Sequence, residues 1–230
     1  MTSASNENTI GKDAPDGFAE LAQVIDRLRA EGGCPWCSEQ THASLVQYLI
    51  EECYELIEAI EAGDRDDMIE ELGDVLYQVM FHADLASKTP GEDFTIEDVA
   101  RRTAEKMMGR HPHVFGDVQY ETAEDVIAVW EELKRIDKPG RESTLDGIPQ
   151  SMPALSLADK LLGKAQKLEL IDVGGPSPFT FETEEELGSF LMAIVASARG
   201  QGLDSERALR GTLRGLQAEI REAEGAESDT

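Results

Sequence analysis

The sequence has few basic residues and no long apolar run. Its 230 residues include 21 Lys and Arg against 47 Asp and Glu, which gives a formal net charge of −26. A chain this acidic is not suited to bind nucleic acid or an anionic membrane through its overall charge. No run of about 18 apolar residues is present, so we expect no membrane span. Residues 1–16 lack the apolar core of a secretory signal, so we expect a cytoplasmic protein.

Cysteine is also scarce, with three in the chain. Cys34 and Cys37 enclose a Pro-Trp dipeptide, and Cys53 follows separately. A Cys-x-x-Cys pair can be a redox couple or half of a zinc site, which His42 and Cys53 could complete. Thioredoxin-like chemistry needs a βαβ context that this chain lacks. Free thiols, a reversible disulfide and zinc stay open, but we expect no required zinc site because only two ligands lie at close spacing.

What the chain has in excess is carboxylate, and two short clusters stand out. The first contains Glu51, Glu52 and Glu55, and the second contains Glu71 and Asp74. Side chains three or four residues apart share a helix face, and like charges at that spacing repel unless a cation lies between them. Two antiparallel helices could direct these oxygens at Mg²⁺, which prefers octahedral oxygen coordination. Acidic pairs are common by chance in so acidic a chain, so their helical phase matters.

The helical phase separates Glu52 from an ordinary solvent-exposed acid. An apolar arc at about 100° per residue is formed by Leu45, Leu49, Cys53, Leu56 and Ile60. Glu52 falls inside this arc, whereas Glu51 and Glu55 fall at its edges. A carboxylate inside an apolar stripe is costly unless it is paired or bound to a metal. The second cluster is expected to lie beside, and not within, the apolar stripe of Leu72, Leu76 and Val79.

Helical patterns run along the whole chain, and no strand pattern stands out, so we predict an all-α protein. Helices are expected over residues 18–30, 40–62, 65–86, 95–108, 123–136, 154–168, 183–199 and 205–222. Gly63 and Asp64 leave so short a turn between the second and third helices that these should form an antiparallel hairpin. The two carboxylate clusters therefore lie on neighbouring helices.

The second half of the chain contains an echo of the second cluster. Residues 70–74 read Glu-Glu-Leu-Gly-Asp, and residues 185–189 read Glu-Glu-Leu-Gly-Ser, which places Glu186 at the position of Glu71. Ser189 replaces the aspartate, and no Glu-Glu-x-x-Glu precedes the echo. The second half therefore resembles a repeat that has lost its site.

Several sequence elements occur in a characteristic order along the chain. They are residues 33–36 (Gly-Cys-Pro-Trp), residues 40–42 (Gln-Thr-His), the two carboxylate clusters and residues 110–117 (Arg-His-Pro-His-Val-Phe-Gly-Asp). Together they resemble the MazG family of nucleoside triphosphate pyrophosphohydrolases, from about Phe18 to Glu222. The family fold is a helical bundle that dimerises and holds Mg²⁺ between helices. The resemblance implies cleavage of nucleoside triphosphates to monophosphate and pyrophosphate, in house-cleaning of non-standard or excess nucleotides.

The resemblance also implies residue roles. The metal ligands would be Glu52, Glu55, Glu71 and Asp74. Glu51 would orient or deprotonate the attacking water. Lys106 and Arg110 resemble the pair that grips the triphosphate, while Trp36 would either stack on the base or pack in the core. We expect Mg²⁺ as the ion, with Mn²⁺ as a substitute, and a homodimer as the assembly.

Many members of this family carry two tandem copies of the domain. By that pattern we expect a disordered tail at 1–16, a catalytic domain at 17–140, a linker at 141–152, a degenerate second copy at 153–224 and a tail at 225–230. Cys37 stands where the family usually has an acid, and Gly215 and Glu219 lie near where it would place basic phosphate ligands. Activity should then rest on the first copy.

Two alternative functions use the same residues. A nucleotide-binding regulatory module would use the pocket with little or no turnover, although the intact carboxylates of the first copy argue against it. A more selective relative would act on dUTP or on phosphoribosyl-ATP, although residues 110–117 favour MazG. A helical interaction scaffold would leave Glu52 inside its apolar arc without an explanation.

Overall fold

In the computed structural model every regular element of the described chain is an α-helix, which confirms the predicted all-α class. The structure describes residues 16–138 and 140–228, so the predicted tail at 1–16 lies almost wholly outside the described residues. Within these two ranges there is no strand, and no helix is long and apolar enough to cross a membrane. The chain divides into two compact units, one ending at Trp130 and the other beginning at Glu131.

The first unit consists of several helices and the first half of one more. They are α1 (Gly17–Arg29), α2 (Pro35–Glu39), α3 (His42–Ala62), α4 (Arg65–Lys88), α5 (Ile96–Arg110), α6 (Pro112–Phe115) and α7 (Ala123–Asp137), inside which the two units divide. Helices α2 and α6 lie outside the helices predicted from the sequence. Both begin with proline, whose fixed φ suits the first helical turn. Helices this short carry no readable periodicity.

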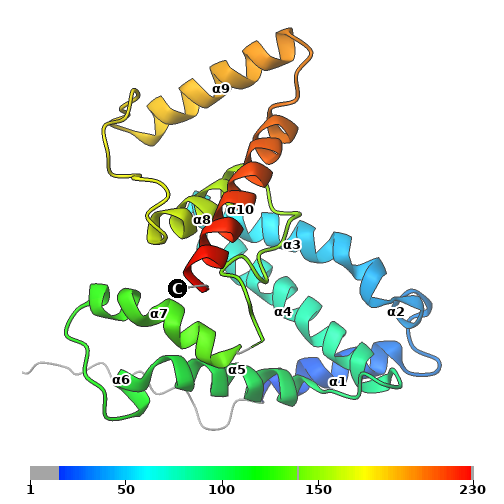
Figure 1. Ribbon diagram of the computed structural model, residues 1–230. Helices are drawn as coiled ribbons and strands as arrows, with labels where there is room; N and C mark the ends of the chain where they lie inside the picture. Colours follow the sequence, from blue (N-terminus) through cyan, green and yellow to red (C-terminus); the bar gives the residue numbers. More distant parts are fainter. Residues whose placement is uncertain (1–15, 139, 229–230) are drawn as a thin grey trace, which may run out of the picture. The chain divides into compact units, whose positions relative to one another are not determined.

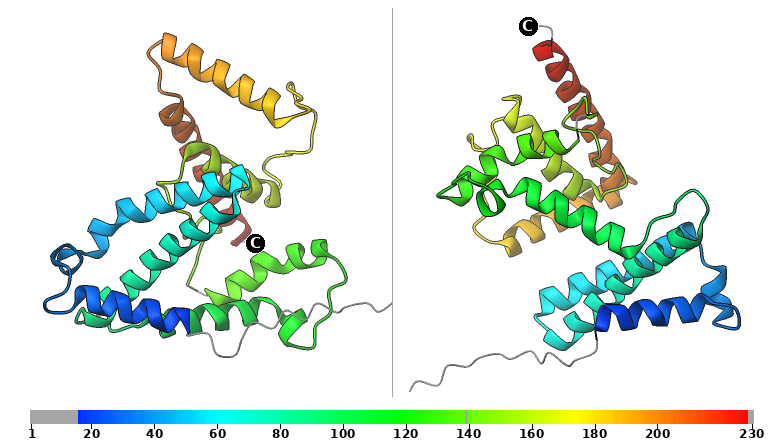
Figure 2. Two further views of the ribbon diagram at one scale, coloured as in Figure 1. Left: turned by 180° about the vertical axis from the view of Figure 1, so that it is seen from behind. Right: turned by 90° about the horizontal axis from the view of Figure 1, so that it is seen from below.

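Helices α3 and α4 form the expected hairpin, and they lie side by side in every view of Figures 1 and 2. Gly63 ends α3 in the left-handed conformation, with φ at 70°, where a side chain would be strained. Asp64 then caps α4 by accepting the backbone N–H groups of Asp66 and Asp67 at 2.9 and 3.2 Å. The chain thus reverses direction within two residues, which sets the two carboxylate clusters on facing helices.

The core of the first unit lies where α1, α3 and α4 meet. Ile25 of α1, Leu45 of α3 and Phe81 of α4 are each no more than 1% exposed. Beside this core, Arg29 of α1 donates a hydrogen bond to Asp84 of α4. Apolar burial and an ion pair therefore both hold α1 on α4, the helix that carries the second carboxylate cluster.

The second unit contains the rest of α7 together with α8 (Ala154–Lys167), α9 (Glu184–Gly200) and α10 (Ser205–Ser228). Its core is formed by Leu157 and Leu161 of α8 with Leu213 and Ile220 of α10. Leu145, from the stretch predicted as a linker, is also buried there. Helix α9 contacts α10 but buries none of its own residues.

Candidate active site

Helix α3 has one buried face, and Glu52 lies at its centre. The less exposed positions of this face are Leu45, Leu49, Glu52, Leu56 and Ala59. They recur every three or four residues and so share one side of the helix. Glu52 is half-buried there, as its phase predicted. The predicted arc was wrong at two positions, because Cys53 is exposed and Ile60 is 56% exposed; the buried face is rotated away from them.

On α4 the predicted apolar stripe was wrong at two of its three positions, because only Leu76 is partly buried against the core. Leu72 is 51% exposed and Val79 is 40% exposed, although both were expected in the buried stripe. The less exposed positions around the second cluster are Met68, Glu71, Val75 and Gln78. Glu71 therefore lies within the buried face and not beside it. The prediction was wrong because polar Glu71 and Gln78 occupy positions where burial favours apolar residues.

Three carboxylates meet where α3 and α4 pack. Glu52, Glu55 and Glu71 each place one oxygen so that all three oxygens lie within 4.8 Å of one another. The Oε2 atom of Glu71 is buried and accepts no hydrogen bond from the described residues. Anionic oxygens this close repel one another, so the arrangement favours a bound cation or a shared proton.

Burial, together with this repulsion, raises the pKa values of Glu52 and Glu71. Burial is the largest cause that raises the pKa of Glu52, and the charges of Asp74 and Glu55 raise it further. Burial likewise raises the pKa of Glu71, with Glu55 and Asp74 adding to the effect. The charge of Asp74 thus acts on both glutamates. A divalent cation at this point would oppose these shifts by favouring the ionised carboxylates.

The donor atoms fit a hard divalent cation. The group of three offers only carboxylate oxygens, which suit Mg²⁺ and Mn²⁺, and Asp74 lies close enough for its charge to act on two of them. The buried Oε2 atom of Glu71 is an acceptor that lacks a donor within the described chain. Glu51 precedes Glu52 on α3, is exposed, and lies outside the group of three.

The predicted substrate-binding residues lie on other elements. Lys106 on α5 is exposed, and the guanidinium carbon of Arg110 lies 5.9 Å from the centroid of the Trp130 ring. Trp36 on α2 is 48% exposed and meets Tyr48 edge to face, with ring centroids 5.6 Å apart. Part of the Trp36 ring is therefore open to solvent. Their roles toward a substrate stay predictions.

One polar residue of this face was missed. Gln78 is 4% exposed, and its Oε1 atom has no hydrogen-bond partner among the described residues. It follows Glu71 by seven residues, about two helical turns, so both lie on one side of α4. That spacing is the signal that would have indicated Gln78. A buried amide oxygen without a partner is costly, which marks Gln78 as a second polar group of the α4 face that a ligand or water could satisfy.

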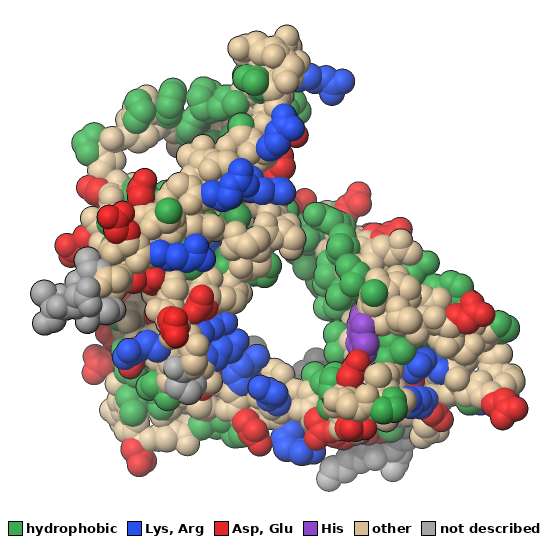
Figure 3. All heavy atoms as spheres, turned by 45° about the vertical axis from the view of Figure 1, so that its right-hand side comes forward, with side chains coloured by type: hydrophobic (Ala, Val, Ile, Leu, Met, Phe, Trp, Pro, Cys, Tyr) green, Lys and Arg blue, Asp and Glu red, His purple; other side chains and the backbone are tan. Residues whose placement is uncertain are grey.

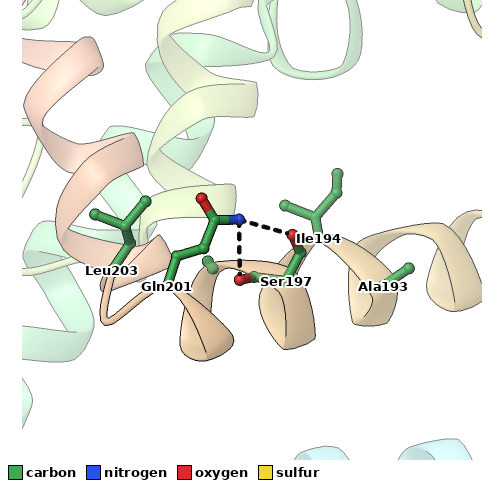
Figure 4. A pocket seen from close by; sticks show the side chains of 6 residues that line it. Ala193, Ile194, Ser197, Gln201 and Leu203 are labelled. Carbon is green, nitrogen blue, oxygen red and sulfur yellow. Dashed lines mark hydrogen bonds between the residues drawn. The ribbon is translucent and has the colours of Figure 1, made fainter.

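The second unit has an open hollow of a different kind. It is lined by Ala193, Ile194, Ser197, Ala198, Gln201 and Leu203 (Figure 4). The amide of Gln201 donates back to Oγ and to the backbone oxygen of Ser197, at 3.1 and 3.3 Å. The lining contains no titratable side chain, so it offers none of the carboxylate chemistry of the first unit.

Comparison with known proteins places this chain in a family. The model of the MazG nucleotide pyrophosphohydrolase domain matches residues 40–115. The nucleoside triphosphate pyrophosphohydrolase/pyrophosphatase MazG of Thermotoga maritima is 41% identical over 223 residues, which cover 88% of this chain and 84% of that protein. The nucleoside triphosphate pyrophosphohydrolase of Escherichia coli K12 is 35% identical over 227 residues, covering 89% and 86%. The chain belongs to the MazG family.

An uncharacterised 26.1 kDa protein of Streptomyces cacaoi is also similar, with 43% identity over 206 residues that cover 90% of this chain and 82% of that protein. The MazG match spans α3 to α6 and contains both carboxylate clusters together with Lys106 and Arg110, whereas Trp36 lies outside it. These matches confirm the family that the motifs predicted. They also confirm the predicted enzyme class, a nucleotide pyrophosphohydrolase.

Proposed function

We propose that the acidic cluster of α3 and α4 hydrolyses nucleoside triphosphates to a nucleoside monophosphate and pyrophosphate with bound Mg²⁺. The observation that carries this proposal is the meeting of Glu52, Glu55 and Glu71 within 4.8 Å. Membership in the MazG family supports the reaction, as do the names of the Thermotoga maritima and Escherichia coli relatives. We further propose non-standard or excess nucleotides as the physiological substrates.

The chain's own side chains would hold the cation and position the attacking water. Its oxygen ligands would come from Glu52, Glu55, Glu71 and Asp74. Glu51 precedes Glu52 on α3 and is open to solvent, so it would orient the water or accept its proton. A divalent cation, when bound, lowers the pKa of water and neutralises charge on the phosphates. Mn²⁺ has similar oxygen chemistry and would replace Mg²⁺.

The triphosphate would need cationic partners, because the chain carries a net charge of −26. Lys106 and Arg110 are four residues apart near the end of α5 and so share one side of that helix. We assign them to the triphosphate. The partly exposed ring of Trp36 offers a flat surface on which a base could stack.

We also propose that the protein is a homodimer, formed through apolar side chains that the hairpin leaves exposed. In Figure 3 hydrophobic side chains are visible at the surface of the part that contains this hairpin. The exposed apolar side chains of the hairpin include Val46, Ile50 and Ile57 on α3 and Ile69, Leu72 and Val79 on α4. Apolar stripes at helical spacing on two neighbouring helices are suited to bury one another in a second copy. Sedimentation equilibrium that finds only monomers would contradict this assembly.

The catalytic proposal is tested by separating its two phosphate products. The full-length protein is incubated with Mg²⁺ and a panel of NTPs, dNTPs and phosphoribosyl-ATP, and pyrophosphate and orthophosphate are measured by independent assays. We expect pyrophosphate alone, lost with a chelator and restored by Mg²⁺ or Mn²⁺. Stepwise orthophosphate release would refute the assigned bond, and no release from any nucleotide would favour the regulatory module. Release from dUTP or phosphoribosyl-ATP alone would favour the selective relatives.

A further inference from the structure

Cys34 and Cys37 lie at the start of α2 in a geometry that permits a bond between them. Cys34 is the N-cap of α2, and its carbonyl accepts the backbone N–H of Ser38 at 3.0 Å, so the first turn begins at Cys34. Residues three apart on a helix have Cα atoms about 5 Å apart. Disulfides span roughly 4.4–6.8 Å between Cα atoms. The two thiols lie close enough for each to shift the pKa of the other.

The two thiols have unlike surroundings. Cys34 is half-buried, whereas Cys37 is 5% exposed and belongs to the core cluster of the first unit. The backbone N–H of Cys37, followed by the Cys37 side chain, lowers the pKa of Cys34. Burial raises the pKa of Cys37, and the neighbouring Cys34 raises it further. One accessible thiol that ionises early and one protected thiol behind it are the two parts of an exchange pair.

We propose that Cys34 and Cys37 form a reversible intramolecular disulfide that makes this protein responsive to the thiol redox state of its surroundings. The oxidant is a low-molecular-weight disulfide. The Cys34 thiolate attacks one sulfur of that disulfide, forms a mixed disulfide and releases one small thiolate. Cys37, after losing its proton, attacks the Cys34 sulfur and releases the second small thiolate. Two protein thiols become one disulfide, and the oxidant takes up both protons and both electrons as two small thiols.

The buried member of the pair connects the disulfide to α4. Tyr77 packs against the core cluster that contains Cys37. Burial, followed by the charge of Cys37, raises the pKa of Tyr77 to about 12. Tyr77 follows Asp74 by three residues on α4 and meets Phe81 edge to face, with centroids 5.6 Å apart. A disulfide replaces the Cys37 thiol by a neutral sulfur that is drawn toward Cys34, which changes the packing and charge beside Tyr77. Oxidation therefore acts on the helix that carries Glu71 and Asp74, a coupling that rests on the proposed function.

The disulfide itself is tested by counting thiols in the full-length protein, without reference to activity. The protein is equilibrated with oxidised and reduced glutathione, alkylated, digested and examined by mass spectrometry. We expect oxidised samples to lose two hydrogens and to be alkylated only at Cys53. In reduced samples we expect Cys34 to be alkylated at least about tenfold faster than Cys37. Three alkylated cysteines under oxidation, or a disulfide formed by Cys53 between chains, would overturn the proposal.

Two variants check the order of attack. In Cys37→Ser the second attack cannot occur, so a mixed disulfide with glutathione should accumulate at Cys34. In Cys34→Ser the buried Cys37 should stay unmodified over the same period. Equal modification of the two variants would contradict the assigned roles. Stoichiometric zinc in the purified protein, with slow thiol modification that a chelator accelerates, would assign the pair to a metal instead.

The coupling to α4 is tested by turnover. We expect the disulfide form to turn over nucleotide about fivefold more slowly, which corresponds to about 1 kcal/mol. Tyr77→Phe lacks the hydroxyl group, so oxidation should change its turnover by less than about twofold. Equal turnover of both wild-type forms would overturn the coupling. Absence of turnover in both forms, with the disulfide still counted, would instead contradict the proposed function.

Discussion

Helices α4 and α9 share the sequence Glu-Glu-Leu-Gly, yet they place it in different parts of the helix. Glu71 is the seventh residue of α4, and one of its oxygens meets those of Glu52 and Glu55. Glu186 is the third residue of α9, where its N–H donates to the Oγ1 atom of Thr183 and its Oε2 accepts the N–H of Glu182. The second glutamate of the shared sequence therefore belongs to the cluster of three carboxylates in α4, whereas in α9 it caps the N-terminus of the helix.

Helices α4 and α9 also differ in the chain segment that precedes each of them. Helix α3 ends two residues before α4 and packs along it. The stretch between α8 and α9 contains no helix, and α9 buries none of its residues. Carboxylates from one helix alone offer a cation fewer converging oxygens than two facing helices do. The echo in α9 therefore lacks a facing set of oxygens as well as the aspartate that Ser189 replaces.

The two units also differ in what surrounds a half-buried acid. In the first unit Glu52 and Glu71 face other carboxylates, and their pKa values are raised. In the second unit burial would raise the pKa of Glu131, but hydrogen bonds from Lys164 and Lys134 outweigh this and lower it to about 2. The second unit thus uses its acid for stability. The first unit keeps carboxylates that repel one another. This repulsion lowers stability, which is reasonable where a cation binds.

The largest difference between the two helices should be in turnover. Glu71→Gln keeps the shape of the side chain but removes one anionic oxygen, so we expect a loss of at least about 100-fold, beyond the 10–100-fold that changes around metal ligands typically cost. Glu186→Gln, the matched change in α9, should leave turnover nearly intact. Glu52→Ala and Asp74→Ala should resemble Glu71→Gln. The measurement is steady-state pyrophosphate release at saturating Mg²⁺.

Folding of each variant is checked by circular dichroism, and Glu58→Gln on the exposed side of α3 is the control for loss of charge alone. If Glu186→Gln abolishes turnover in a folded protein while Glu71→Gln does not, the site belongs to the second unit. If both are inactive, the two helices act in one site and the comparison fails.

These contrasts show what the sequence could predict. The hairpin and the position of Glu52 followed from Gly63, Asp64 and the apolar period of α3, which local geometry governs. The buried face of α4 did not, because an apolar period marks any face that avoids water. Leu72 and Val79 are exposed in the single chain. The ion pair of Glu131 was also missed, since Lys164 is 33 residues away and only tertiary packing joins them.

The next effect concerns stability against acid in the second unit. The pKa of Glu131 is about 2 in the folded protein against its ordinary value of 4.5, so its contribution is fully present above 4.5 and is lost as pH falls toward 2. Glu131→Gln should lower the free energy of unfolding at neutral pH by about 1 to 2 kcal/mol, allowing for partial exposure. Urea unfolding of both proteins from pH 7 to pH 3 is the measurement, and a difference that stays constant below pH 4.5 would contradict the pairing.

The smallest expected effect is a difference between Glu71 and Glu186 in what each contributes to the free energy of unfolding. Glu186→Ala removes the side chain that closes the α9 N-terminus, although Thr183 still caps it, so we expect a loss of about 0.5 kcal/mol. Glu186→Gln can still accept the Glu182 N–H and should lose less.

Glu71→Gln should have the opposite effect and stabilise the metal-free protein. Its raised pKa means that folding disfavours the charged form, so removal of the charge should stabilise the protein above the ordinary pKa of glutamate. Urea unfolding in chelator gives both values, and adding Mg²⁺ should stabilise wild type and Glu186→Ala more than Glu71→Gln. Equal stabilisation of all three by Mg²⁺ would show that Glu71 holds no cation.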